Sequence, residues 1–169
     1  MTFRALKAEE IECRVGTCSE KGVSLLLYKD SRCDMRILDE TYGIGGWQNS
    51  YNTINNELFC TIMVRNSDGD WVCKQSNGSP SNMEAEKGRA SDAFKRAGFM
   101  LGIGRELYTA PFIWVPADKC NISKNRQGKP TCYDRFRVQK IKIEEGRIKA
   151  VAIVNENKRE VCFIWQEGN

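Results

Sequence analysis

Residues 84–108 read EAEKGRASDAFKRAGFMLGIGRELY and form the longest uninterrupted helical pattern in the sequence. At about 100° per residue, the pattern separates into an apolar stripe and a charged face. The apolar stripe consists of Ala90, Phe94, Ala97 and Leu101. The opposite face consists of Asp92, Lys95, Arg96 and Phe99. An aromatic ring on a charged face indicates contact with another subunit or with a ligand.

Three glycines, Gly88, Gly98 and Gly102, lie on the flank of this helix beside Lys95. Each glycine destabilises a helix by about 1 kcal/mol relative to alanine. Their presence therefore predicts that another backbone approaches closely on this side. A surface helix with solvated charges is the alternative interpretation.

The length of 169 residues predicts one domain with a hydrophobic core, with room for an appendage. No apolar run approaches the roughly 20 residues that a membrane-spanning helix needs. The first residues, MTFRALKAEEIEC, are charged throughout and lack the apolar region of a secretory signal. We therefore expect a cytoplasmic protein that has no membrane partner.

Eight cysteines and no histidine occur in the sequence, and no two cysteines form a CxxC pair. Cys60, Cys73 and Cys162 lie in strand-like apolar runs, where cysteine acts as a small buried hydrophobe. We expect reduced thiols, no metal site and no cofactor. Since the commonest general base is absent and no other catalytic motif is present, we also expect no enzymatic activity.

Charge is distributed unevenly along the chain. Residues 119–149 contain 10 Lys and Arg against 3 Asp and Glu, a net charge of +7, whereas residues 1–118 carry −2. A basic block of this kind attracts polyanions such as nucleic acid. A solubilising segment is the equally open alternative.

The first half of the chain predicts an antiparallel three-stranded meander with the long helix packed on it, a β-β-β-α core of the α+β class. Asn55-Asn56 suits the tight turn between the first two strands of the meander. Ser81 or Asn82 is a candidate N-cap for the long helix. The predicted elements are a helix at 3–15, a strand at 23–28, a helix at 30–42, strands at 47–54, 58–65 and 71–76, and the helix at 84–108.

The remainder of the chain predicts a small C-terminal β-meander with strands at 137–143, 148–154 and 161–165. Residues 121–131 are polar and basic, which is typical of a mobile loop. We therefore expect a core at 1–115, a basic flexible loop at 116–132 and a β-meander appendage at 133–169.

Residues 5–113 resemble the Rad-fifty-two family of single-strand annealing recombination proteins, in their short bacteriophage and prophage forms. The resemblance is carried by Gly46-Trp47 after a helix that ends at Tyr42-Gly43, by the Asp68-Gly69 turn and, most specifically, by residues 84–108 with the run ASDAFKRA at 90–97. It implies a ring of identical subunits that holds single-stranded DNA in a basic groove and exposes its bases for pairing. The implied role is DNA annealing in homologous recombination and double-strand break repair, with a host or phage single-strand-binding protein as a candidate partner.

Within this family, an adjacent Lys-Arg pair of the long helix lines the groove, which corresponds to Lys95 and Arg96. A basic residue near the second helix also contributes in the family, and Arg32 or Arg36 is its nearest counterpart. Phe99 departs from the eukaryotic members, which carry a further cation there. Read from the residues alone, binding of single strands needs cations for phosphates and rings for bases. The helix and its continuation supply these through Arg89, Lys95, Arg96, Phe99 and Arg105.

Two other functions fit the pattern. A double-stranded RNA-binding module also combines a three-stranded meander with helices, but it uses basic residues at a helix start, where this chain has Glu84 and Glu86. An oligomeric scaffold that binds no nucleic acid would use Phe99 and the glycines for packing, and would pair Lys95 and Arg96 with Asp92 or a neighbouring subunit.

Overall fold

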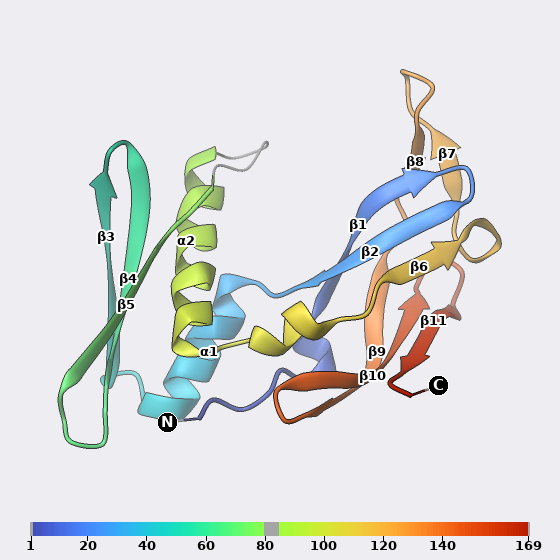
Figure 1. Ribbon diagram of the computed structural model, residues 1–169. Helices are drawn as coiled ribbons and strands as arrows, with labels where there is room; N and C mark the ends of the chain where they lie inside the picture. Colours follow the sequence, from blue (N-terminus) through green and yellow to red (C-terminus); the bar gives the residue numbers. More distant parts are fainter. Residues whose placement is uncertain (1, 80–84, 169) are drawn as a thin grey trace. The chain divides into compact units, whose positions relative to one another are not determined.

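The computed structural model describes residues 2–79 and 85–168, with side chains from residue 88 onward in the second range (Figure 1). The candidate cap at Ser81 or Asn82 lies outside the described residues. The chain forms two compact units. The meander unit contains Met1–Arg4 and Asp30–Arg105, and the six-stranded unit contains Ala5–Lys29 and Glu106–Asn169.

The meander unit contains the predicted three-stranded antiparallel sheet, which confirms this part of the α+β fold. Its strands are β3 (Trp47–Ile54), β4 (Glu57–Arg65) and β5 (Trp71–Asn77), in the order β3-β4-β5. Asn55 and Asn56 both have positive φ angles, 51° and 63°. Two consecutive left-handed residues allow the two-residue turn that the sequence predicts between β3 and β4.

Helix α1 (Ser31–Tyr42) agrees with the predicted helix at 30–42. It begins at Asp30, whose Oδ1 accepts a hydrogen bond of 2.8 Å from the Cys33 backbone N–H. After the helix ends, the chain turns back so tightly that a Cβ on Gly46 would lie 2.1 Å from the Tyr42 carbonyl oxygen. This position therefore requires glycine, which explains the glycine-rich end of the helix.

Helix α2 (Ala85–Leu101) packs along β4 and β5, as the green and yellow-green ribbons of Figure 1 show. Phe94 and Ala97 of the predicted stripe are fully buried, and the Phe94 ring meets Trp47 edge-on with centroids 6.0 Å apart. The other two stripe residues, Ala90 and Leu101, are half-buried.

The predicted helix at 84–108 is too long at its C-terminal end. Gly102 and Gly104 have φ angles of 122° and 71°, so the α-helix ends at Leu101. A 3-10 turn, η2 (Arg105–Thr109), follows. The two glycines terminate the helix because they adopt conformations that other residues rarely reach.

The six-stranded unit has a mainly antiparallel sheet in the order β11-β10-β9-β1-β2-β6. The two edge strands, β11 and β6, contact each other, so the sheet curls around its own core. The strands are β1 (Glu12–Ser19), β2 (Gly22–Tyr28), β6 (Ile113–Pro116), β9 (Phe136–Glu144), β10 (Arg147–Asn155) and β11 (Glu160–Gln166). Fully buried side chains of this core include Val23, Val115, Val138, Ile148 and Ile153.

Three expectations for this part of the chain are corrected. Residues 3–15 form a short 3-10 turn, η1 (Ala8–Glu10), and then β1, because β1 pairs with β2 along most of its length. Residues 121–131 are not an irregular loop, since β7 (Ile122–Lys124) and β8 (Pro130–Cys132) pair as a hairpin after a 3-10 turn, η3 (Ala117–Lys119).

The expected division at residues 115 and 132 also differs from the observed one. The predicted C-terminal β-meander is present as β9-β10-β11, but it shares one sheet with β1, β2 and β6. Because these strands come from both ends of the chain, neither 1–115 nor 133–169 is a separate compact unit.

Candidate nucleic-acid interface

Arg96 lies on the side of α2 opposite the buried residues Phe94 and Ala97. Its side chain is 52% exposed and forms an ion pair with Asp92 one turn earlier, with 3.1 Å between Nε and Oδ2. Asp92 also accepts a hydrogen bond of 3.0 Å from the Ser79 backbone N–H. The carboxylate of Asp92 thus both neutralises Arg96 in part and ties α2 to the chain that follows β5.

Lys95 lies on the flank of α2 that faces α1. Ser91, one turn before it, donates a hydrogen bond of 3.2 Å to the Ser31 hydroxyl of α1. A Cβ on Gly98, one turn after it, would lie 3.1 Å from Asp34 Oδ2. The group that approaches Gly98 is therefore the Asp34 side chain of α1 in the same chain, and not the backbone that the sequence predicts. Lys95 is half-buried between these two contacts.

Phe99 lies on the same outer side of α2 as Arg96 and is half-buried. The Arg105 guanidinium lies 5.6 Å from the centre of its ring. Arg105 also donates hydrogen bonds of 2.8 and 2.7 Å to the carbonyl oxygens of Phe99 and Met100. Arg105 therefore caps the C-terminal end of α2 and covers one face of the phenyl ring.

Arg32 and Arg36 lie one turn apart on α1 and are exposed. At about 100° per residue they lie on the side of α1 turned away from Ser31 and Asp34, which face α2. The structure therefore does not bring them beside Lys95.

Arg32 pairs with Asp30, with 2.9 Å between Nε and Oδ2. Burial alone would raise the pKa of Asp30, but hydrogen bonds from Cys33 and Arg32 outweigh it and lower the pKa. The carboxylate therefore stays ionised and competes with a phosphate for Arg32.

Arg89 lies where β5 approaches α2. A Cβ on Gly78 would lie 2.0 Å from the Arg89 carbonyl oxygen, so the two backbones are in contact. The Arg89 Nε is buried and has no hydrogen-bond partner among the described residues. Of the predicted site residues, the structure thus places Arg96, Phe99 and Arg105 along the outer side and end of α2, and Lys95 on the neighbouring flank toward α1. These four residues are here called the α2 surface.

Four of the ten cations in the basic block at residues 119–149 form ion pairs with acidic side chains. Ion pairs join Lys124 to Glu20 at 3.1 Å, Arg137 to Glu156 at 3.1 Å, Lys142 to Glu144 at 2.9 Å, and Lys149 to Glu167. Three of the four acidic partners lie outside the block. Its surroundings are therefore less positive than its own sequence suggests.

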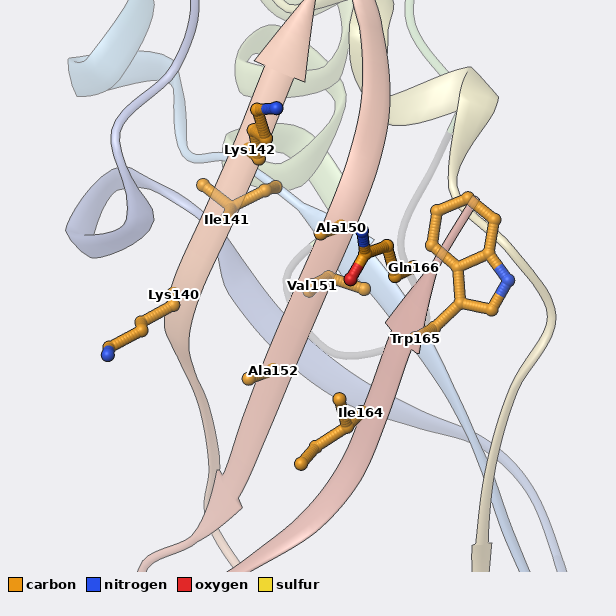
Figure 2. A pocket seen from close by; sticks show the side chains of 9 residues that line it. All are labelled: Lys140, Ile141, Lys142, Ala150, Val151, Ala152, Ile164, Trp165 and Gln166. Atoms are coloured by element: carbon orange, nitrogen blue, oxygen red, sulfur yellow. The ribbon is translucent and has the colours of Figure 1, made fainter. Parts of the chain in front are cut away.

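One surface feature of the six-stranded unit was not anticipated from the sequence. Figure 2 shows a shallow hollow over β9, β10 and β11, where Ala150 and Ala152 form the floor between Lys140 and Ile164. Ile164 is 75% exposed although it lies in a predicted strand. The sequence predicts that the side chains of this strand alternate between two faces of the sheet. It could not show that the face with Ile164 remains uncovered.

The cysteines include both buried and exposed thiols. Cys60 and Cys162 are buried as predicted, and burial raises the pKa of each thiol to about 11. Cys73 is exposed, so its predicted burial is wrong: it lies on the edge strand β5, on the face of the sheet turned away from α2. No group of three potential metal ligands occurs among the described residues. Those residues likewise include no helix with the length and apolarity needed to cross a bilayer.

Comparison with known proteins finds no family model and no curated protein that matches this chain.

Proposed function

We propose that this protein binds single-stranded DNA on the α2 surface and anneals complementary strands in homologous recombination, as a closed homo-oligomer in the cytoplasm. The observation that carries the proposal is that the exposed Arg96 and the half-buried Lys95 and Phe99 lie within about one turn of each other on a helix whose other side is buried against β4 and β5. Cations beside an aromatic ring are the chemistry that binds single strands without sequence preference.

Annealing needs no nucleophile, metal ion or nucleotide. The protein has to hold phosphates on cations so that the strand stays extended and its base edges remain free for pairing. A helix backed by a sheet presents such cations at fixed positions, and an oligomer repeats them along the strand. The resemblance of residues 84–108 to the Rad-fifty-two family supports the same proposal.

Fluorescence anisotropy with labelled oligo-dT, measured at two salt concentrations, tests the binding step. We expect affinity to fall with salt at a slope of about −0.7 per phosphate contact. A strand that is already bound to the protein should form a duplex with its complementary strand faster than the same strand does without protein. Absence of oligo-dT binding at low salt would contradict the proposal.

The homo-oligomer is supported by the two edges of the three-stranded sheet, since edge strands are usually paired or covered. Light scattering should give a multiple of 19.3 kDa at micromolar concentration. A mass equal to that of one chain would contradict this part of the proposal.

One observation favours a second candidate, an oligomeric scaffold that does not bind nucleic acid. In such a scaffold, Arg96 would be neutralised by Asp92, as in the observed ion pair, and not by a DNA phosphate. In this case the oligomer would form, but oligo-dT would not bind to it.

A further inference from the structure

Strand β3 is an unusually unprotected edge strand. In the part of the chain that the structure describes, it pairs with β4 on one side and with no strand on the other. Its sequence, WQNSYNTI, contains no charged residue and no proline, and every residue after Trp47 is exposed. Edge strands that remain single usually carry lysine, proline or a bulge, because free backbone groups otherwise recruit another strand. β3 has none of these features.

Beyond Trp47, both faces of β3 are also exposed. Because α2 packs over β4 and β5, Tyr51 on the inner face remains 43% exposed, and Ile54 on the outer face is 42% exposed. The Tyr51 hydroxyl reaches the Ala90 carbonyl oxygen only at 3.5 Å. A strand that is open on its edge and on both faces has space for a neighbouring strand.

Strand β5 forms the opposite edge of the same sheet, and its first five residues are exposed. It carries one charged residue, Lys74, and exposes Trp71 and Val72. Both β3 and β5 run antiparallel to β4, so they point in the same direction. If a second copy lies beside the first with its strands pointing in the same direction, its β5 is therefore parallel to β3 of the first copy.

From these observations we infer that β3 of one copy pairs in parallel with β5 of the next copy, which continues the three-stranded sheet from subunit to subunit. This head-to-tail contact uses two different edges, so every copy offers its β3 edge to one neighbour and its β5 edge to the other. The assembly closes into a ring when the rotation between successive copies adds up to a full turn. A two-fold β3–β3 contact would cover one edge in each copy and leave β5 open. The inference rests on the oligomeric part of the proposed function and does not depend on DNA binding.

Side-chain chemistry on the outer face of the sheet agrees with this arrangement. Gln75 of β5 donates hydrogen bonds to Asn52 of β3 at 3.2 Å and to Thr61 of β4 at 2.8 Å, so amides and hydroxyls already bridge the three strands. Gln48 and Ser50 lie on this same face of β3. A neighbouring β5 would present a further Gln75 beside them, and the polar row would continue into the next subunit.

The native Cys73 allows a direct test. It is exposed on β5, and it shares the outer face with Gln48, Ser50 and Asn52, since Gln48 and Cys73 are both opposite Met63. In the continued sheet, Cys73 of one copy lies near one of these three residues of the next. Neighbouring strands place Cα atoms at a separation that a disulfide can span.

The experiment uses the full chain with Gln48→Cys, Ser50→Cys or Asn52→Cys, mildly oxidised without DNA and separated on a denaturing gel. We expect at least one variant to give a ladder of multiples of 19.3 kDa. Asn49→Cys, on the inner face of the same strand, is the matched control and should remain monomeric on the gel. The ladder should disappear when Cys73→Ser is added.

Three results would overturn the inference. The first is the absence of a ladder from every outer-face variant. The second is a dimer band that survives Cys73→Ser, which would show β3–β3 pairing. The third is a wild-type dimer that Cys73→Ser removes, which would show β5–β5 pairing. Oligo-dT binding by the same preparations is measured separately. A ladder without DNA binding would refute the proposed function and leave this interface standing, whereas DNA binding without a ladder would do the reverse.

Discussion

Two regions of this protein have cations that suggest polyanion binding from the sequence, and the structure surrounds these cations differently. The block at residues 119–149 has a net charge of +7, but four of its cations are paired with carboxylates, mostly from other parts of the chain. The α2 surface has fewer cations, and of these Lys95 and Arg96 lie beside an aromatic ring on a sheet-backed helix. Charge summed along a segment is therefore a poor guide to the local field, because three of the four neutralising carboxylates come from turns outside that segment.

The largest expected effect separates these regions directly. The double substitution Lys95→Ala with Arg96→Ala should weaken oligo-dT binding by roughly 3 kcal/mol or more, a loss of about 100-fold. Both side chains lie outside the α2 core, so the circular-dichroism spectrum should not change. The salt slope should become shallower by about 1.4, the value for two lost phosphate contacts.

The matched control removes the same amount of charge from the other region. Lys140→Ala with Lys142→Ala should leave most of the affinity intact. If this control lost as much affinity for oligo-dT as the α2 double variant, the two regions would contribute equally to binding. That result would contradict a DNA site on the α2 surface.

Phe99 is the next test, because it can contact either a neighbouring subunit or a base. We expect Phe99→Ala to weaken the oligomer in size-exclusion chromatography, with loss of DNA binding as a consequence, since a buried aromatic ring contributes mainly through area removed from water. Met100→Ala, which removes an adjacent exposed side chain, should leave the elution volume unchanged. An intact oligomer whose affinity falls by about 1–3 kcal/mol would show stacking on a base instead.

Local sequence signals predicted the meander unit well. The Asn55-Asn56 turn, the end of α1 and the buried Phe94 each depend on residues close in the chain or on one helical period. The six-stranded sheet could not be predicted as such, because β1 meets β9 through a pairing of Glu12 with Arg137. The helical spacing of apolar residues in 3–15 was misleading, because pairing with β2 determines the structure there.

For the candidate site, helical periodicity correctly placed Lys95, Arg96 and Phe99 outside the core of α2. It could not show that Arg105 caps the helix, or that Arg32 pairs with Asp30 on the far side of α1. Both depend on side-chain contacts outside the spacing of a single helix. The sequence therefore predicted which residues of α2 lie outside its core, but it could not show which cations already have partners in the same chain.

The basic block should make a smaller contribution to DNA binding. Replacing Lys140 and Lys142 by Gln should reduce affinity about threefold at low salt and have little effect at high salt, because exposed charges are screened. Substitution is preferable to truncation after Val115, which would remove β9, β10 and β11 from the sheet. Lys142 is itself paired with Glu144, so Lys124→Gln, which breaks the ion pair with Glu20, is a control for the loss of a paired cation elsewhere in the block. An unchanged affinity would make the block a solubilising or protein-binding segment.

The smallest expected effect is a gain of affinity, from Asp92→Asn. The carboxylate of Asp92 lies 3.1 Å from the Arg96 Nε and places a negative charge on the α2 surface. At a separation of about 8 Å in water, one charge repels a phosphate by roughly 0.5 kcal/mol, so its removal should tighten oligo-dT binding about twofold. Asparagine keeps an oxygen that can accept the hydrogen bond from the Ser79 N–H, so the contact between α2 and the chain after β5 should persist.

The alternative function makes the opposite prediction for this variant. In a scaffold, Asp92 serves to neutralise Arg96, and its loss should loosen the assembly without creating a DNA site. Asp92→Asn is therefore measured by anisotropy and by light scattering on the same sample. Tighter oligo-dT binding with an unchanged mass supports a phosphate site on α2, because only a bound polyanion benefits from removal of that carboxylate. A fall in mass with no gain in binding would assign the ion pair to subunit packing.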